Sequence, residues 1–227
     1  MSVFFNEGEA YQMFDLKNVN YETKGQLILR PITLSIPQNA FIVVSGPSGS
    51  GKSTLLKILG GLVSYTDGIL LYNGKQQKEY NMQDYRKEVS YFFQTPVLFG
   101  ETVRDNLKFP YDIRGLEFDE THVKALLNRV GLSDFMNKGI HEISGGEKQR
   151  VALIRNVVFM PKVLLLDEVT SALDIESKEA VWNFVNYLYK TEGLTIISVT
   201  HHSDEIQNAT HRIIIEEGSV TDYESEY

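Results

Sequence analysis

The sequence contains no cysteine among its 227 residues, which excludes disulfide bonds and thiolate metal sites and fits a reducing compartment. It also has no apolar run long enough to cross a bilayer as a helix, so we expect no direct membrane insertion. The first residues, MSVFFNEGEAYQ, lack the basic start and long apolar stretch of a secretion signal.

Positive charge is scarce as well. The chain has 22 Lys and Arg residues against 30 Asp and Glu residues, which gives a net charge of −8. A surface of this sign repels nucleic acid and anionic lipid, so we expect no nucleic-acid partner. If the protein works at a membrane, another protein must hold it there. The hydrophobic fraction of 42% is enough for the core of one large domain.

The chain alternates between strand-like and helix-like patterns. Alternating apolar and polar residues predict half-buried strands early in the chain, whereas continuous β-rich runs predict strands buried on both faces. The predicted strands are FDLKNVNYE, ITLSI, AFIVVSG, GILLYNG, EVSYFFQ, KVLLLDE, LTIISVTH and HRIIIEEG. The predicted helices between them are GKSTLLKILGGL, residues 176–190 and a short helix after Ser203. This order predicts a mainly parallel sheet with ligands at the carboxyl ends of its strands.

Between about residues 95 and 160 the patterns are helical, and no strand-like run interrupts them. We therefore expect one domain whose α/β core, about 11–94 and 161–220, contains an inserted helical lobe, about 95–160. The acidic residues 221–227 are expected to form a frayed tail.

The segment GPSGSGKS matches the phosphate-loop pattern G-x-x-x-x-G-K-[ST]. Its glycines let backbone N–H groups surround phosphates, while Lys52 reaches the β and γ oxygens and Ser53 can bind Mg²⁺. A simple Gly-rich turn is the alternative, but the motif stands between a buried strand and a helix, where phosphate binding requires it. The candidate nucleotide-binding residues are Gly46, Pro47, Ser48, Gly49, Ser50, Gly51, Lys52, Ser53 and Thr54.

The strand KVLLLDE ends in two carboxylates. A buried parallel strand brings Asp167 to the edge of the sheet near the phosphate loop, where it can hold Mg²⁺. Glu168 follows and can orient or polarise the attacking water. The alternative is a core strand that ends in a solvated acidic turn.

Three further candidates are weak signals by themselves. Gln94 ends a predicted strand and could reach the metal or the water, but a glutamine there is often a surface residue. His201 follows a strand, where histidine is usually structural or solvated. Tyr21 could stack on an adenine or equally be a core aromatic.

The segment ISGGE also precedes a predicted helix. Serine is a good helix N-cap, and this role is sufficient to explain the presence of Ser144 at this position. Two adjacent glycines, Gly145 and Gly146, are unfavourable in a simple cap and suit close approach of a ligand to the backbone. Spacing alone leaves both interpretations open.

In chain order, these motifs resemble the nucleotide-binding domain of ATP-binding cassette (ABC) transporters, and the resemblance covers essentially the whole chain. It implies an α/β P-loop NTPase fold of ABC type, with a mainly parallel sheet core, N-terminal antiparallel strands and an inserted helical lobe. The matching motifs are the Walker A loop GPSGSGKS, the Q-loop Gln94, the signature ISGGE, the Walker B strand LLLDE, the D-loop SALD, the switch His201 and the A-loop Tyr21.

The resemblance implies an ATPase that uses ATP and Mg²⁺. The implied catalytic residues are Lys52, Gln94, Glu168 and His201, and the implied metal-binding residues are Ser53, Gln94 and Asp167. It also implies a head-to-tail homodimer, in which Ser144, Gly145 and Gly146 of one chain contact the ATP of its partner. The signature departs from the usual LSGGQ at Ile143 and Glu147, and His202 stands where an acidic residue is common.

The chain resembles the separate ATP-binding subunit of a bacterial transporter. It is expected to dock through its helical lobe and the surface near Gln94 onto an integral-membrane permease, at the cytoplasmic face of the cell membrane. The runs YRKEVSYFFQTPVLFGETVRDNLKFP and ISGGEKQRVALIRNVVFMPKVLLLDEVTSALD are similar to the Fet-type (YbbL-like) exporters implicated in iron efflux. The iron cargo rests on this resemblance alone, because the sequence has no Cys/His cluster with metal-ligand spacing.

Two alternatives from other classes remain. One is a soluble ABC ATPase that acts on a scaffold, as in iron–sulfur cluster assembly or cell division. The other is a nucleotide-binding module without catalysis, against which the intact Lys52, Asp167, Glu168 and His201 argue.

Overall fold

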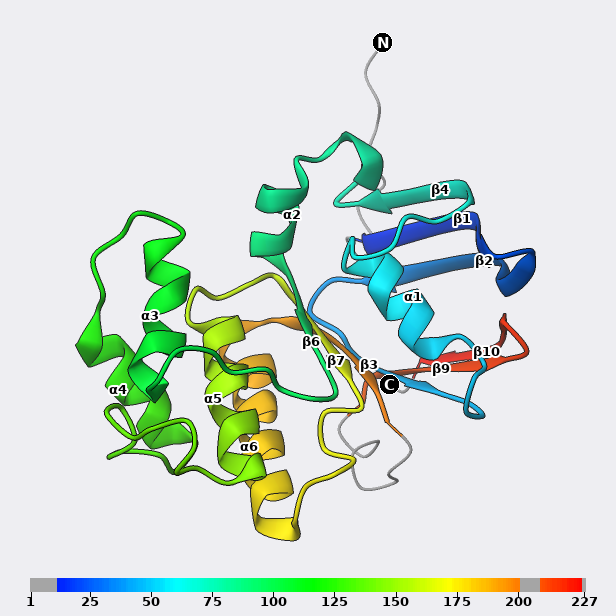
Figure 1. Ribbon diagram of the computed structural model, residues 1–227. Coiled ribbons are helices and arrows are strands. Elements are labelled where there is room, and N and C mark those ends of the chain that lie inside the picture. The colour runs from blue at the N-terminus through cyan, green and yellow to red at the C-terminus, as the bar shows by residue number, and fades with distance from the viewer. Residues whose placement is uncertain (1–11, 201–208, 226–227) are drawn as a thin grey trace.

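Two sheets of different kinds lie next to each other in the protein (Figure 1). The computed structural model describes residues 12–200 and 209–225. In the larger sheet, of order β10-β9-β3-β8-β7-β6, all neighbours pair in parallel except β10, which is antiparallel to β9. Its strands are β3 (Phe41–Ser45), β6 (Val89–Phe92), β7 (Val163–Asp167), β8 (Thr195–Val199), β9 (His211–Glu216) and β10 (Ser219–Ser225).

The smaller sheet is antiparallel, with the order β2-β1-β4-β5. Its strands are β1 (Gln12–Thr23), β2 (Gln26–Pro37), β4 (Asp67–Tyr72) and β5 (Lys75–Gln76). The helices of the described residues are α1 (Lys52–Leu59), the short 3-10 helix η1 (Gln77–Glu79), α2 (Met82–Glu88), α3 (Val103–Asp112), α4 (Glu120–Arg129), α5 (Gly145–Val157) and α6 (Ile175–Glu192).

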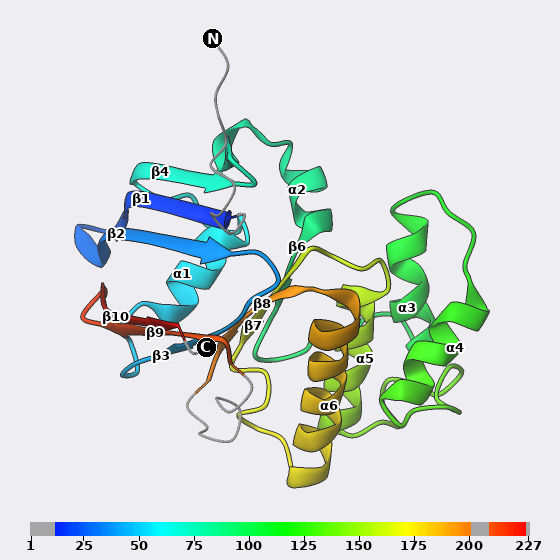
Figure 2. The ribbon, with the colours of Figure 1, turned by 180° about the vertical axis from the view of Figure 1, so that it is seen from behind.

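The central strands β3, β7 and β8 of the larger sheet are buried on both faces. Successive side chains of a strand point to opposite sides. In β7, Leu164 and Leu166 belong to the core cluster shared with α3 to α6, whereas Val163 and Leu165 belong to the cluster shared with α1 and the antiparallel strands. Both views show α5 and α6 beside the sheet and α3 and α4 further out (Figures 1 and 2). The predicted α/β fold, with its mainly parallel core and N-terminal antiparallel strands, is confirmed.

Within 95–160 the structure contains α3, α4 and α5 and no extended strand. These helices have no separate core, since Leu107 of α3 and Val151 of α5 share one cluster with Phe92 and Leu164 of the sheet. The division of the chain into core and lobe therefore stays a prediction.

Several sequence predictions need correction. The acidic tail is not frayed over 221–225, because these residues form most of β10 and pair with β9. Their side chains are largely exposed, so backbone pairing rather than burial orders them. Helix α2, strand β5 and η1 were not predicted. The short helix expected after Ser203 lies outside the described residues.

Candidate functional site

The predicted site residues meet at the carboxyl edge of the parallel sheet. The phosphate loop follows β3, Asp167 ends β7 with Glu168 directly after it, and Gln94 lies two residues beyond β6. Strand β8 separates β3 from β7, and β6 is the other neighbour of β7. The sheet order therefore brings segments that are far apart in sequence to one edge, as ligand binding at a parallel sheet requires.

The backbone of the phosphate loop depends on glycine at two positions. Gly46 has a φ of 138°, and a Cβ there would lie 2.0 Å from the carbonyl oxygen of Ile215 in β9. Gly51 is the N-cap of α1 with a φ of 106°. Because glycine has no side chain, it leaves the first N–H groups of α1 to a ligand. A positive helix end with free donors of this kind can hold an anion.

The Lys52 side chain is buried beneath the loop. Its ammonium donates to the carbonyl oxygens of Gly46 at 2.9 Å and Pro47 at 2.8 Å. Burial lowers the pKa of Lys52, while the nearby Glu168 and Asp167 carboxylates act in the opposite direction. These bonds hold the cation against the loop that it is predicted to serve.

Ser53 and Asp167 are in direct contact. The Ser53 hydroxyl donates to Oδ1 of Asp167 at 2.7 Å, and the Asp167 residue is only 8% exposed. One hydroxyl oxygen and one carboxylate at hydrogen-bond distance form a pair of oxygen ligands of the kind that Mg²⁺ prefers.

A residue that the sequence analysis missed completes this contact. The hydroxyl of Tyr91, in β6, donates to Oδ2 of Asp167 at 2.6 Å. Burial raises the pKa of Tyr91, and the hydrogen bond to the carboxylate raises it further, so the hydroxyl stays protonated and donates. The available signal was a tyrosine inside a buried strand, since a buried hydroxyl needs a partner.

Glu168 occupies an unusual turn. Its φ is 51°, a left-handed conformation that costs a residue with a side chain roughly 1–3 kcal/mol. Its backbone N–H donates to the carbonyl oxygen of Val199, and its own carbonyl accepts from the Ser171 hydroxyl at 3.0 Å. Gln94 Nε2 lies 3.2 Å from Glu168 Oε2 and 3.3 Å from Ser171 Oγ. Gln94 thus contacts the carboxylate predicted to act on water.

A cavity of about 200 Å³ joins the phosphate loop to Glu168, and Lys52, Ser53 and Thr54 line it. Tyr21 lies opposite Leu29 in the β1–β2 ladder, and Leu29 packs against Gly51. Tyr21 is half-buried at the edge of the core, so its stacking on adenine stays a prediction. His201 lies outside the described residues.

The signature segment forms a helix cap at the start of α5. Ser144 Oγ accepts from the backbone N–H of Glu147 at 3.3 Å, and the Glu147 carboxylate accepts from the backbone N–H of Ser144 at 2.6 Å. The glutamate at the position of the usual signature glutamine thus completes a capping box. The start of α5 lies well apart from the start of α1, so Ser144 does not join the phosphate loop of its own chain (Figure 1).

The two signature glycines have different surroundings. A Cβ at Gly145 would meet nothing within 4 Å, whereas a Cβ at Gly146 would lie 2.1 Å from Ser177 Oγ in α6. Further along α5, Gln149 Nε2 donates to the carbonyl oxygen of Val169, just after Glu168. The sequence analysis missed Gln149 and Ser177, which connect the signature helix to the segments after β7.

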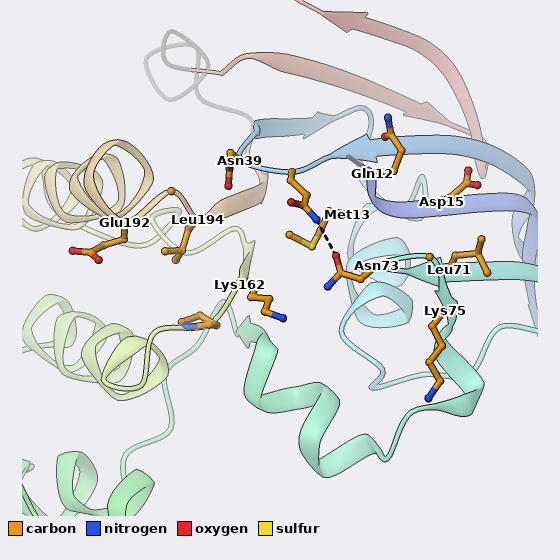
Figure 3. A pocket seen from close by; sticks show the side chains of 14 residues that line it. Gln12, Met13, Asp15, Asn39, Leu71, Asn73, Lys75, Lys162, Glu192 and Leu194 are labelled. Carbon is orange, nitrogen blue, oxygen red and sulfur yellow. Dashed lines mark hydrogen bonds between the residues drawn. The ribbon is translucent and has the colours of Figure 1, made fainter. Parts of the chain in front are cut away.

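A larger cavity, of about 970 Å³, lies at the opposite end of the sheet (Figure 3). Asn39, Lys162 and Leu194 line it, and they precede β3, β7 and β8 respectively. It therefore lies at the amino ends of the parallel strands and contains none of the predicted site residues. Ligands of open α/β sheets bind at the other edge.

Residues 12–200 and 209–225 contain no group of three or more His, Cys, Asp or Glu side chains placed to hold a metal ion by themselves. Over the same residues, no helix has the length and apolar character needed to cross a membrane.

A family model described as "ABC transporter" matches residues 29–171. The chain is 44% identical over 209 residues to the probable iron export ATP-binding protein FetA of Escherichia coli (strain K12), covering 92% of this chain and 93% of that protein. It is 36% identical to the spermidine/putrescine import ATP-binding protein PotA of Clostridium novyi (strain NT), of which it covers 60%.

Similarity extends to other transporter subunits and to a solved structure. The chain is 32% identical to the energy-coupling factor transporter ATP-binding protein EcfA of Pediococcus pentosaceus, covering 92% of this chain and 78% of that one. A bacterial Atm1-family ABC exporter with ATP bound superimposes with a TM-score of 0.84 at 23% identity. The superposition covers 96% of this chain and 39% of the exporter chain. The two proteins therefore share a fold.

Proposed function

The chain belongs to the ABC transporter family as an ATP-binding subunit with ATPase activity, and we propose that it powers a separate membrane permease that exports its cargo, with iron as that cargo. The observation that supports export of iron is the similarity to FetA, which extends over nearly the full length of both chains. The similarity to the importer PotA is lower and covers 60% of that protein.

The residues near the phosphate loop suit a nucleotide bound with Mg²⁺. In this proposal the N–H groups at the start of α1 and the Lys52 ammonium bind the phosphates, and Ser53 and Asp167 hold the ion. The paired hydroxyl and carboxylate oxygens fit a hard cation. When bound, the ion would neutralise charge that develops on the phosphate oxygens.

Glu168 is the proposed general base. It directly follows the proposed metal ligand Asp167, and its backbone adopts a left-handed turn. Its side chain lines the cavity beside Lys52 and Ser53. Gln94, in contact with Glu168, is proposed to position the same water or the metal. A carboxylate at this edge can take a proton from water while Lys52 stabilises the charge on the phosphate. His201 is proposed to sense the γ-phosphate, and Tyr21 is proposed to stack on the adenine.

We further propose that two chains pair head to tail around ATP. The exposed Ser144 and the open space at Gly145 leave the signature N-terminus accessible to a second chain. Ile175, at the start of α6 in the D-loop region, is 78% exposed, which suits an interface residue. Each chain would then supply half of two equivalent sites, as in a closed symmetric dimer.

Permease docking is proposed at a cavity of about 530 Å³ beside Gln94. Two of its lining side chains, Phe93 and Val97, are 54% and 72% exposed. Phe109, Ile113 and Leu116, in and just after α3, expose further apolar area. Exposed apolar side chains that share one cavity, as Phe93 and Val97 do, are typical of a protein interaction surface. Docking here would hold the chain at the cytoplasmic face of the cell membrane without insertion.

The proposed cargo and direction can be tested by cellular iron content. Cells of the native host that lack this chain are loaded with iron, transferred to iron-free medium, and sampled for iron, manganese and zinc by mass spectrometry. Export predicts that the deletion strain retains more iron, and that wild-type protein but not Glu168→Gln restores its loss. Retention of another metal would reassign the cargo, and lower iron in the deletion strain would contradict export.

A further inference from the structure

The carboxylate of Asp167 is held from two sides. Ser53, at the start of α1, donates to Oδ1 at 2.7 Å, and Tyr91, in β6, donates to Oδ2 at 2.6 Å. Tyr91 is 8% exposed and lies opposite Leu165 in the ladder between β6 and β7. Each oxygen therefore has its own donor, and the two donors come from different elements.

A buried tyrosine hydroxyl always needs an acceptor, so the bond by itself does not establish a role in the reaction. The same core cluster contains Tyr72, whose hydroxyl donates to Oε2 of Glu88 at 2.9 Å. Glu88 is 40% exposed and also pairs with Lys162, far from the nucleotide edge. Tyr91 differs because its acceptor is the buried carboxylate that contacts Ser53 of the phosphate loop.

The Tyr91 hydroxyl constrains how that carboxylate can turn. A carboxylate rotates about its last side-chain bond unless hydrogen bonds hold its plane. With Oδ2 bound to Tyr91, Oδ1 is the oxygen that faces Ser53. Ligating carboxylates are commonly fixed in this way by outer partners.

We propose that Tyr91 is a positioning residue for the metal ion: its hydroxyl holds Asp167 Oδ2 so that Oδ1 is presented beside Ser53 to Mg²⁺. This inference rests on the proposed function, in which Asp167 and Ser53 hold the ion. It does not make Tyr91 a ligand or a proton carrier.

Tyr91→Phe removes the hydroxyl and keeps the ring, which packs against Phe93 with centroids 4.7 Å apart. The measurement is Mn²⁺ affinity by electron paramagnetic resonance, on the Glu168→Gln background with ATP, using protein in excess so that the nucleotide is bound. Loss of the outer partner is expected to weaken Mn²⁺ binding roughly tenfold. ATP affinity in EDTA should be unchanged, because the Tyr91 hydroxyl donates to Asp167 rather than to the phosphate loop.

Tyr72→Phe is the matched control, because it removes an equivalent tyrosine–carboxylate bond from the same core cluster. It should leave Mn²⁺ affinity at the wild-type value, while its melting temperature reports the general cost of such a loss. Equal Mn²⁺ affinities for wild type, Tyr91→Phe and Tyr72→Phe would overturn the proposal. So would an equal weakening in both variants.

Asp167→Asn separates this inference from the proposed function. If it abolishes tight Mn²⁺ binding while Tyr91→Phe does not change it, only the role of Tyr91 is wrong. If Asp167→Asn binds Mn²⁺ normally, the proposed metal site itself is wrong.

A further pair of replacements keeps the test valid if Tyr91→Phe folds poorly. Tyr91→p-aminophenylalanine keeps a donor at the same place and should restore Mn²⁺ affinity. Tyr91→p-fluorophenylalanine keeps the size without a donor and should not. Similar affinities for these two variants would also overturn the proposal.

Discussion

The hydroxyl of Ser53 donates to Asp167 Oδ1 at 2.7 Å, although 114 positions separate the two residues in the chain. Ser53 belongs to the helix after β3, and Asp167 ends β7, with β8 between these strands. The parallel sheet thus joins the phosphate-binding half of the site to its acidic half.

Lys52→Ala should weaken ATP binding about 10- to 100-fold, since a hydrogen bond to a charged group contributes about 1.5–3 kcal/mol. Isothermal titration calorimetry measures the affinity. Lys108→Ala is the control, because Lys108 lies in α3 and forms an exposed ion pair with Asp112 at 2.6 Å. ATP affinity that is the same for both variants would contradict the role of Lys52.

Glu168→Gln should lower phosphate release about 10²- to 10⁴-fold, the usual contribution of a general base, and leave ATP binding intact. Because ATP then persists in the site, the variant should elute as a dimer with ATP and Mg²⁺. Light scattering coupled to size exclusion determines the mass. A monomer at saturating ATP would count against the head-to-tail arrangement.

Substitution of Gly145 should change dimer formation without changing stability. Gly145→Ala introduces a methyl group into open space, so its melting temperature should equal that of the parent. In the Glu168→Gln background it should nevertheless lose the ATP-dependent dimer, because in the proposed dimer that space receives the partner's nucleotide.

Gly146→Ala should behave differently. Its Cβ would lie 2.1 Å from Ser177 Oγ, and such overpacking costs about 1–3 kcal/mol, or a few degrees of melting temperature in a chain of this size. Differential scanning calorimetry compares both variants. If Gly145→Ala still forms the dimer, Gly145 does not face the partner's nucleotide.

Val97→Asp should reduce the amount of permease recovered with the tagged subunit, because it places a charge on the proposed docking surface. The Val97 side chain lines the docking cavity and is 72% exposed. Ile69→Asp is matched in chemistry but lies in β4 of the antiparallel sheet, where Ile69 is 42% exposed. It should recover the permease normally. Equal recovery with both variants would place the docking surface elsewhere.

The fold and the phosphate edge could be predicted because they depend on local patterns. Continuous apolar runs indicated β3, β7 and β8, and the spacing of Gly46, Lys52 and Ser53 indicated the loop between β3 and α1. Strand β10 could not be predicted from its acidic, exposed residues, because its extended structure depends on backbone pairing with β9.

The contacts between distant segments could not be predicted from the sequence either. Nothing in the segment VSYFFQ indicates that the Tyr91 hydroxyl meets Asp167, because that contact depends on the pairing of β6 with β7. The interpretation of Ser144 as a helix cap, by contrast, needed only neighbouring residues and is confirmed. Its contact with the ATP of a partner depends on a second chain and stays a prediction.

The central claim is that this ATPase drives a membrane permease, and affinity purification from the native host tests it most directly. The tagged chain is purified from detergent-solubilised membranes with ATP present, and the proteins recovered with it are identified and quantified. The account predicts an integral-membrane protein with several spans in stoichiometric amount. A soluble partner recovered instead, or no partner at all, would contradict it and favour an ABC ATPase that acts on a scaffold.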